Sequence, residues 1–314
     1  MMALVYCTTV AYGIVVGPRM TVLFAGEAAP LVTLMATALA MALLALYVKL
    51  AERFPNLSIF QWIVRLLGPL GYVLAVVLLL YLLSLVAFHG YNFALLLQLL
   101  FLNRTPLWVI VIFGYILAFS GAYLGLETMA RFFQITMCLE LVALPPLLLV
   151  GPSTFTWTHF QPWLPMDATT WFLGPLVALG SFVGFAHAPL ALYPHIQTGG
   201  KILRPSLIGL SLAAVFIVGF TTSVLGVFGP DAVRFTLYPT FDYSQVAQVP
   251  LPLSFLARYS LFFSIIWVLA VTKLTMIDLF IVATGIRQIL GLRSYQWPAG
   301  GGDGGRRGRH RPDS

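Results

Sequence analysis

Charged residues are scarce in this chain, and their scarcity excludes most classes of soluble protein. Only 9% of the 314 residues are Asp, Glu, Lys or Arg, whereas 60% are hydrophobic. A soluble domain carries about 25% charged residues. The basic residues behind the net charge of +7 are scattered at the ends of apolar runs or gathered in a short tail, so we expect no nucleic-acid partner. The composition indicates a polytopic membrane protein.

Cysteine is also rare, and motifs for catalysis or metal binding are lacking. Cys7 and Cys138 both lie in apolar runs, which is typical of small packing residues rather than of a disulfide framework. The histidines and cysteines do not have the spacing of a metal site. The first apolar run lacks the basic leader and the cleavage site of a signal peptide. We expect no metal, no cofactor and no enzymatic activity.

Long apolar runs fill most of the chain. A membrane-spanning helix needs about 20 mostly apolar residues, and the sequence predicts eight spans, of which the third continues as a helix to Leu102. They cover roughly residues 3–17, 30–50, 69–91, 106–124, 128–150, 172–194, 205–228 and 258–285. The segment 297–314 is rich in Gly and Arg and is expected to be disordered.

The distribution of basic residues predicts the orientation in the membrane. If the N-terminus is cytoplasmic, the inner loops carry Lys49, Arg53, Arg65, Arg131, Lys201, Arg204, Arg287 and Arg293. The outer loops then carry Arg19, Arg104, Arg234 and Arg258. The excess on one side places both termini in the cytoplasm by the positive-inside rule.

The run from Trp171 to Pro194 is apolar enough to span a bilayer, yet its composition weakens a helix. It contains Gly174, Pro175, Gly180, Gly184, His187 and Pro189. A broken helix frees backbone N–H and C=O groups, and in hydrocarbon such groups must be covered by protein, water or a ligand. We therefore interpret this run as a candidate binding site.

The first span has a similar weak point at Tyr12-Gly13, followed by Gly17-Pro18. Broken helices in corresponding positions of two repeats predict an inverted-repeat transporter architecture with a central site. The alternative for Gly13 is close helix packing, which small residues permit in membranes.

Lys273 is the strongest single-residue signal. It lies in the apolar run SLFFSIIWVLAVTKLTMIDLF, where an ammonium costs at least ~2.5 kcal/mol on insertion scales. One hypothesis is a fixed internal cation that ties the eighth span to the broken first span. The alternative is that Lys273 snorkels to the cytoplasmic surface beside Asp278.

Other polar residues lie at membrane depth. Glu140 is interpreted as a partner of Lys273, as a cavity-facing group or as a neutral structural residue. A single histidine on an apolar helix, such as His187 or His89, is more often a packing residue than a ligand-binding residue. Of the two, His187 is the better candidate for ligand binding, because its helix is broken. Glu127 and Arg131, spaced i,i+4, predict an interfacial ion pair.

Several segments together resemble the GerAB-type spore germination permeases. They are Gly17-Pro18-Arg19 with Ala25-Gly26, Ala51-Glu52-Arg53-Phe54-Pro55, Thr105-Pro106-Leu107-Trp108-Val109, Gly125-Leu126-Glu127 with Arg131, and the series Gly229-Pro230, Tyr238-Pro239-Thr240, Ile266-Trp267-Val268-Leu269, Lys273 and Gly291-Leu292. The resemblance covers about residues 10–296, and the order and spacing of the segments make it specific.

The resemblance implies an all-α, LeuT-like inverted-repeat fold of the amino acid–polyamine–organocation superfamily. The first five-helix repeat would be residues 1–150 and the second residues 172–292. It implies a germinant-receptor subunit in the spore inner membrane that senses a small germinant, with an amino acid as the first hypothesis. The partners would be an A-type subunit and a C-type lipoprotein. The implied ligand-binding residues are Tyr12, Gly13, Gly180, Ser181, Phe182, Gly184, Phe185, His187 and Lys273.

The chain departs from the family pattern in two ways. Phe185 stands where relatives often have an acidic residue after the glycine of the sixth span. The sequence predicts eight spans instead of the family's ten, and the second repeat stops after three helices. Two further hypotheses therefore stand beside the receptor: a secondary amino acid transporter, and a truncated remnant without function.

Overall fold

Helices account for nearly all of the chain in the computed structural model, which describes residues 1–149, 154–164, 167–182, 184–195, 202–246 and 259–291; these ranges contain no strand. The long helices are α3 (Ala29–Glu52), α5 (Pro69–Leu100), α6 (Leu107–Tyr123), α7 (Leu126–Leu149), α10 (Leu203–Phe235) and α12 (Tyr259–Ile289). The short helices are α1 (Met2–Gly13), α2 (Gly17–Ala25), α4 (Ile59–Leu67), α8 (Ala168–Leu179), α9 (Gly184–Leu192) and α11 (Pro239–Val246). Single 3-10 turns are η1 (Gly26–Ala28), η2 (Trp157–Phe160), η3 (Gly180–Phe182) and η4 (Tyr193–His195).

Helical runs of membrane-spanning length agree with a polytopic membrane protein. In the described ranges, five runs are long and apolar enough to cross a bilayer: Gly17–Glu52, Pro69–Leu100, Leu126–Leu148, Leu203–Phe235 and Ser260–Ile289. The first of these combines α2 and α3, although the turn η1 separates them. Met2–Gly13, Leu107–Tyr123 and Ala168–Phe182 are apolar but shorter. The count of eight spans stays a prediction, whereas the extension of α5 agrees with the helix expected to reach Leu102.

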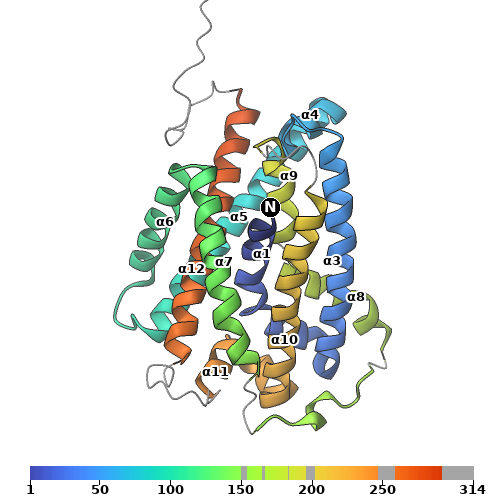
Figure 1. Cartoon of the computed structure of the whole chain (residues 1–314), viewed down its shortest axis with the longest axis vertical. Helices are drawn as coiled ribbons and strands as arrows, with labels where there is room; N and C mark the ends of the chain where they lie inside the picture. Colours follow the sequence, from blue (N-terminus) through green and yellow to red (C-terminus); the bar gives the residue numbers. More distant parts are fainter. Residues whose placement is uncertain (150–153, 165–166, 183, 196–201, 247–258, 292–314) are drawn as a thin grey trace, which may run out of the picture.

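The short helix α1 lies at the centre of the bundle, and its residues from Ala3 to Gly13 are all buried. It packs against α10, α12, α9 and α7. Figure 1 shows α5, α6, α7 and α12 on one side of α1 and α3, α8 and α10 on the other, with α4 near one end of the bundle and α11 at the other. A helix in this position is apolar on every face, which explains why the sequence of α1 has no polar stripe.

Helix α8 begins with a side-chain cap. The Asp167 carboxylate accepts a hydrogen bond from the Thr170 backbone N–H at 2.8 Å. This bond and one from the Thr170 hydroxyl lower the pKa of the Asp167 carboxyl below its ordinary value. The cap fixes where the second weak helix starts.

The Gly/Arg-rich segment 297–314 lies outside the described residues, and the membrane orientation and the two-repeat division stay predictions.

Candidate functional site

A helix is interrupted at both places where the sequence predicts a break. Helix α1 ends at Gly13, residues 14–16 form a turn, and α2 begins at Gly17. Helix α8 ends at Leu179, the turn η3 follows, and α9 begins at Gly184. Helix α1 contacts both η3 and α9, so the two interruptions lie against each other inside the bundle.

Side chains from other helices satisfy backbone groups that the first interruption frees. The Thr240 hydroxyl of α11 donates to the Ile14 carbonyl at 2.5 Å, and the Trp267 indole of α12 donates to the Ala11 carbonyl at 3.0 Å. The Val16 N–H donates back to the Tyr12 carbonyl at 2.9 Å. An unpaired backbone group in an apolar interior is costly, so these donors stabilise the non-helical turn.

The second interruption approaches α1 so closely that only glycine fits. The Thr8 hydroxyl donates to the Gly184 carbonyl at 3.0 Å. A Cβ atom on Gly184 would lie 2.0 Å from the Thr8 carbonyl oxygen, and one on Gly13 would lie 2.8 Å from the Ser181 carbonyl oxygen. Gly184 therefore permits backbone contact between α1 and α9, and Gly13 permits close approach of η3 and of the Ile217 side chain of α10.

A cavity of about 200 Å³ opens beside the two interruptions. Its lining comes from α1, the turn after it and α2, from α5, from α8, η3 and α9, and from α12. The lining residues are Thr8, Thr9, Tyr12, Val16, Gly17, Met20, Leu85, Phe88, His89, Val177, Gly180, Ser181, Gly184 and Leu274. Most of this lining is apolar. Its polar groups are the hydroxyls of two threonines and a serine and the side chains of Tyr12 and His89. Such a lining suits a small ligand with an apolar part and few polar groups.

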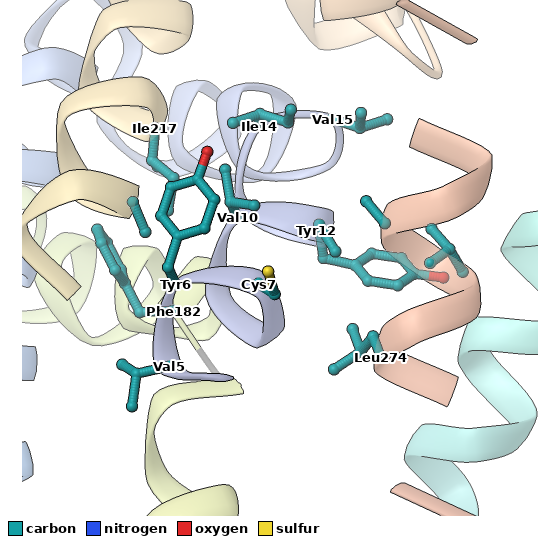
Figure 2. Close-up of a cluster of buried hydrophobic side chains, with 14 of the residues drawn as sticks. Val5, Tyr6, Cys7, Val10, Tyr12, Ile14, Val15, Phe182, Ile217 and Leu274 are labelled. Carbon is teal, nitrogen blue, oxygen red and sulfur yellow. The ribbon is translucent and has the colours of Figure 1, made fainter. Parts of the chain in front are cut away.

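The structure places four of the predicted site residues around this cavity, namely Tyr12, Gly180, Ser181 and Gly184. Gly13 lies at the end of α1 and contacts Ile217 and Ser181 instead. Phe182 is fully buried in the core. Figure 2 shows Phe182 near Tyr6 on one side of α1, whereas Tyr12 extends from the other side toward α12 and Leu274. The side chains of Phe185 and His187 lie outside the described part of the chain.

Lys273 does not line the cavity, because it forms a buried ion pair. Its Nζ lies 2.6 Å from Oε1 of Glu140 on α7, and the two side chains are 0% and 2% exposed. This contact joins α12 to α7 behind α1. The pairing with Glu140 is therefore the arrangement the structure shows, and surface snorkelling beside Asp278 is wrong, because Lys273 and Asp278 are both fully buried.

A second buried contact, between a histidine that lines the cavity and an acidic side chain, lies beside it. His89 Nδ1 on α5 is 3.0 Å from Asp278 Oδ2 on α12, and the side chains are 2% and 0% exposed. The geometry is a close charge contact rather than a linear hydrogen bond. The ring of Tyr12 stacks on the His89 imidazole at 4.6 Å, and its hydroxyl donates to the His89 carbonyl at 3.1 Å. The sequence gives no spacing signal for this pair, and Asp278 alone resembled a surface residue.

Helix α12 thus carries a lysine and an aspartate, Lys273 and Asp278, five positions apart, and each contacts a side chain of a different helix. In the described ranges, no group of three or more His, Cys, Asp or Glu side chains is arranged to hold a metal ion. The polar side chains at the cavity are therefore hydroxyls and an imidazole.

A family model described as "Spore germination protein" (Spore_permease) matches residues 1–299. The chain belongs to this family. Among curated proteins, it is similar to "Spore germination protein YndE" of Bacillus subtilis (strain 168), with 20% identity over 242 residues. This match covers 77% of this chain. The match spans 66% of that relative's length. The resemblance inferred from the sequence is thereby confirmed at the level of the family, which is a family of membrane proteins rather than of enzymes.

The buried pair on α7 and the exposed pair on the same helix predict losses of stability that differ greatly in size. Glu140→Gln leaves the Lys273 ammonium buried beside an amide and is expected to lower the free energy of unfolding by about 3–5 kcal/mol. Glu127→Gln removes the pair with Arg131, which is 2.6 Å long but 71% and 74% exposed, and is expected to cost less than about 0.5 kcal/mol. Thermal unfolding of the purified variants in detergent measures both, and equal melting temperatures would contradict the burial argument.

Two neighbouring glycines are expected to respond differently to alanine. At Gly184 the new methyl group meets the Thr8 backbone, so α9 must move away from α1, at a cost of at least about 1–3 kcal/mol. At Gly180 nothing lies within 4 Å of the added Cβ, so the melting temperature should not change. Membrane accumulation and thermal unfolding of the two variants provide the comparison. A Gly184→Ala protein as stable as Gly180→Ala would show that the close contact is dispensable.

Proposed function

We propose that this protein is a membrane subunit of a spore germinant receptor and that it senses a small amino acid in the cavity beside the two interruptions. The observation that carries the proposal is the cavity itself, which lies beside the two helix interruptions in a member of a spore germination family. A cavity of about 150 Å³ already holds a molecule the size of benzene, so about 200 Å³ accommodates a small aliphatic amino acid.

The proposed architecture is the LeuT-like inverted repeat. The first repeat would be residues 1–150 and the second residues 172–292, each opened by a helix that is interrupted near its middle. In support, α1–α2 and α8–α9 are both interrupted, and each contacts the other across the cavity. Both termini would be cytoplasmic, and the membrane would be the spore inner membrane.

The ligand's carboxylate would lie at the N-terminal ends of α2 and α9. Gly17 and Gly184 begin these helices and line the cavity. The first N–H groups of a helix have no partner within the helix, and the dipole there is positive, so an anion is stabilised. The apolar side chain would contact Leu85, Phe88 and Leu274. In this proposal Phe185 and His187, on α9, adjust selectivity.

Binding would act by shifting an equilibrium between two arrangements of the bundle. An A-type membrane subunit and a C-type lipoprotein would detect that change. The Lys273–Glu140 pair would serve as a fixed internal cation and anion that hold α12 and α7 together behind α1, in place of a bound coupling cation. A receptor of this kind needs no sodium or potassium ion to bind its germinant.

Filling the cavity tests the site. Gly180→Leu places a side chain where nothing lies within 4 Å of the Cβ, so the fold is expected to persist while bound ligand is excluded. Binding of radiolabelled L-alanine, L-valine and L-leucine to the purified full chain should fall at least about tenfold, as expected when a ligand group is sterically blocked. Gly180→Ala is the matched control with smaller loss. Unchanged binding of every amino acid by Gly180→Leu would exclude this cavity as the site.

Spores carrying the same variants as their only copy separate the receptor from a transporter. A receptor subunit predicts loss of the germination response with no uptake of labelled L-valine into vesicles that contain the wild-type protein. Saturable uptake into such vesicles would favour a secondary transporter instead.

Removing the internal cation tests the role of Lys273. Lys273→Ala is expected to abolish the germinant response while the protein still accumulates in the membrane, because Glu140 is left without its counter-charge. The double variant Lys273→Met with Glu140→Met removes both charges and should restore stability, since apolar residues often replace a buried pair without loss. If the double variant also restores a full germinant response, the pair is structural only, and the proposed functional role is wrong.

A further inference from the structure

Among the described residues, one hydroxyl in the cavity wall is left without a hydrogen-bond partner. The hydroxyls of Thr8, Thr9 and Tyr12 line the same cavity, and each donates to a backbone carbonyl, at 3.0, 2.7 and 3.1 Å. Ser181 in η3 also lines the cavity and is only 8% exposed, yet its hydroxyl makes no hydrogen bond to any residue that the structure describes. A buried hydroxyl without a partner costs free energy, so a ligand that accepts from it is stabilised.

The Ser181 hydroxyl lies at the N-terminus of α2. A Cβ atom added to Gly17, the first residue of α2, would lie 2.9 Å from Ser181 Oγ and 3.1 Å from Ser181 Cβ. Gly17 therefore leaves room for the hydroxyl, and both residues line the cavity. The free hydroxyl and the start of the helix consequently share one corner of the cavity.

In the described part of the chain, no side chain caps the N-terminus of α2. Its N-cap residue is Val16, whose side chain cannot accept a hydrogen bond, and the first turn carries no acidic residue. The first N–H groups of a helix have no partner within the helix, and the dipole is positive at this end. A hydroxyl donor beside such a helix end favours an anion as the bound group.

Two kinds of donor in one corner select an acceptor with a negative charge. A carboxylate has only acceptors, and its two oxygens can face two donors at once. None of the described lining residues is Asp, Glu, Lys or Arg, so the lining itself supplies no anion for these donors. The rest of the lining is mostly apolar around a volume of about 200 Å³, which fits a carboxylate joined to a small apolar group better than an inorganic anion.

We propose that Ser181 determines specificity by donating a hydrogen bond from its hydroxyl to the carboxylate of the ligand at the N-terminus of α2. The inference rests on the proposed function and adds to it a recognition residue and a ligand class, the small apolar carboxylates, to which aliphatic amino acids belong. The carboxylate is then the end of the amino acid that lining side chains recognise by charge, because the described lining contains no acidic side chain for the ammonium.

Two fragments of L-valine test which end is recognised. Isovalerate keeps the carboxylate and the branched side chain but lacks the amine, whereas isobutylamine keeps the amine and lacks the carboxylate. In competition with radiolabelled L-valine on the purified full chain, isovalerate should displace the label at a concentration at least about tenfold lower than isobutylamine, since a site built to hydrogen-bond one group rejects an analogue that lacks it. Equal or stronger displacement by isobutylamine would overturn the proposal.

Ser181→Ala removes the donor and nearly keeps the shape of the cavity. L-valine and isovalerate should bind about 10- to 100-fold more weakly, the usual loss for one hydrogen bond to a charged group. The binding of isobutylamine should not change. Because the hydroxyl has no partner in the described ranges, its removal should not lower the melting temperature. A lower melting temperature with an unchanged ratio of the affinities for isovalerate and isobutylamine would show a structural role and contradict the proposal.

Ser206→Ala is the matched control. Ser206 on α10 is fully buried, its hydroxyl has no partner among the described residues, and it is not part of the cavity lining. The same chemical change at this position should leave the affinities for L-valine and isovalerate at their wild-type values. Equal loss of binding in the two variants would mean that a missing hydroxyl acts through the fold, and the role of Ser181 in recognition would be wrong.

The outcomes separate this inference from the proposed function. Wild-type affinity for L-valine in Ser181→Ala would overturn carboxylate recognition by Ser181 while leaving an amino-acid site in place. Failure of every tested amino acid to bind to the wild-type protein would overturn both.

Discussion

An interrupted helix in an apolar interior must find partners for the backbone groups it frees, and the arrangement of this bundle follows from that requirement. Helix α1 is buried along its length and stops at Gly13. The donors that complete its backbone come from α11 and α12, which lie far away in the chain: Trp267 and Ala11 are separated by 256 positions. The interruption is therefore stabilised by the closed bundle as a whole rather than by local sequence.

The second constraint is electrostatic, and it acts through α12. This helix carries Lys273 and Asp278, and each is paired with a different neighbour, α7 for the lysine and α5 for the aspartate. Removing one partner from a buried pair costs far more than removing both. The four side chains consequently fix the position of α12 relative to two other helices.

Much of this architecture could be predicted from the chain alone, because its main signals are local. Glycine and proline within apolar runs located both interruptions, and an ammonium and a carboxylate at membrane depth identified Lys273 and Glu140 as residues that need partners. The contact between His89 and Asp278 could not be predicted, because the two residues lie on different helices and a single histidine in an apolar run carries no spacing signal. The snorkelling alternative for Lys273 placed Asp278 at the cytoplasmic surface, whereas the structure buries it. The division into repeats rests on the resemblance and the number of spans on the apolar runs, and both stay predictions.

The contrast between Gly180 and its neighbours has a consequence for how the family can diversify. A Cβ atom on Gly184 would meet the Thr8 backbone, and one on Gly13 would meet the Ile217 side chain and the Ser181 carbonyl oxygen, so neighbouring segments would have to shift. Gly180 faces open space and lines the cavity. A single codon change there alters the volume of the cavity while the scaffold stays the same. Within five residues, the chain thus has one position, Gly180, where substitution can change the cavity volume with little loss of stability, and another, Gly184, where substitution disturbs the packing of helices.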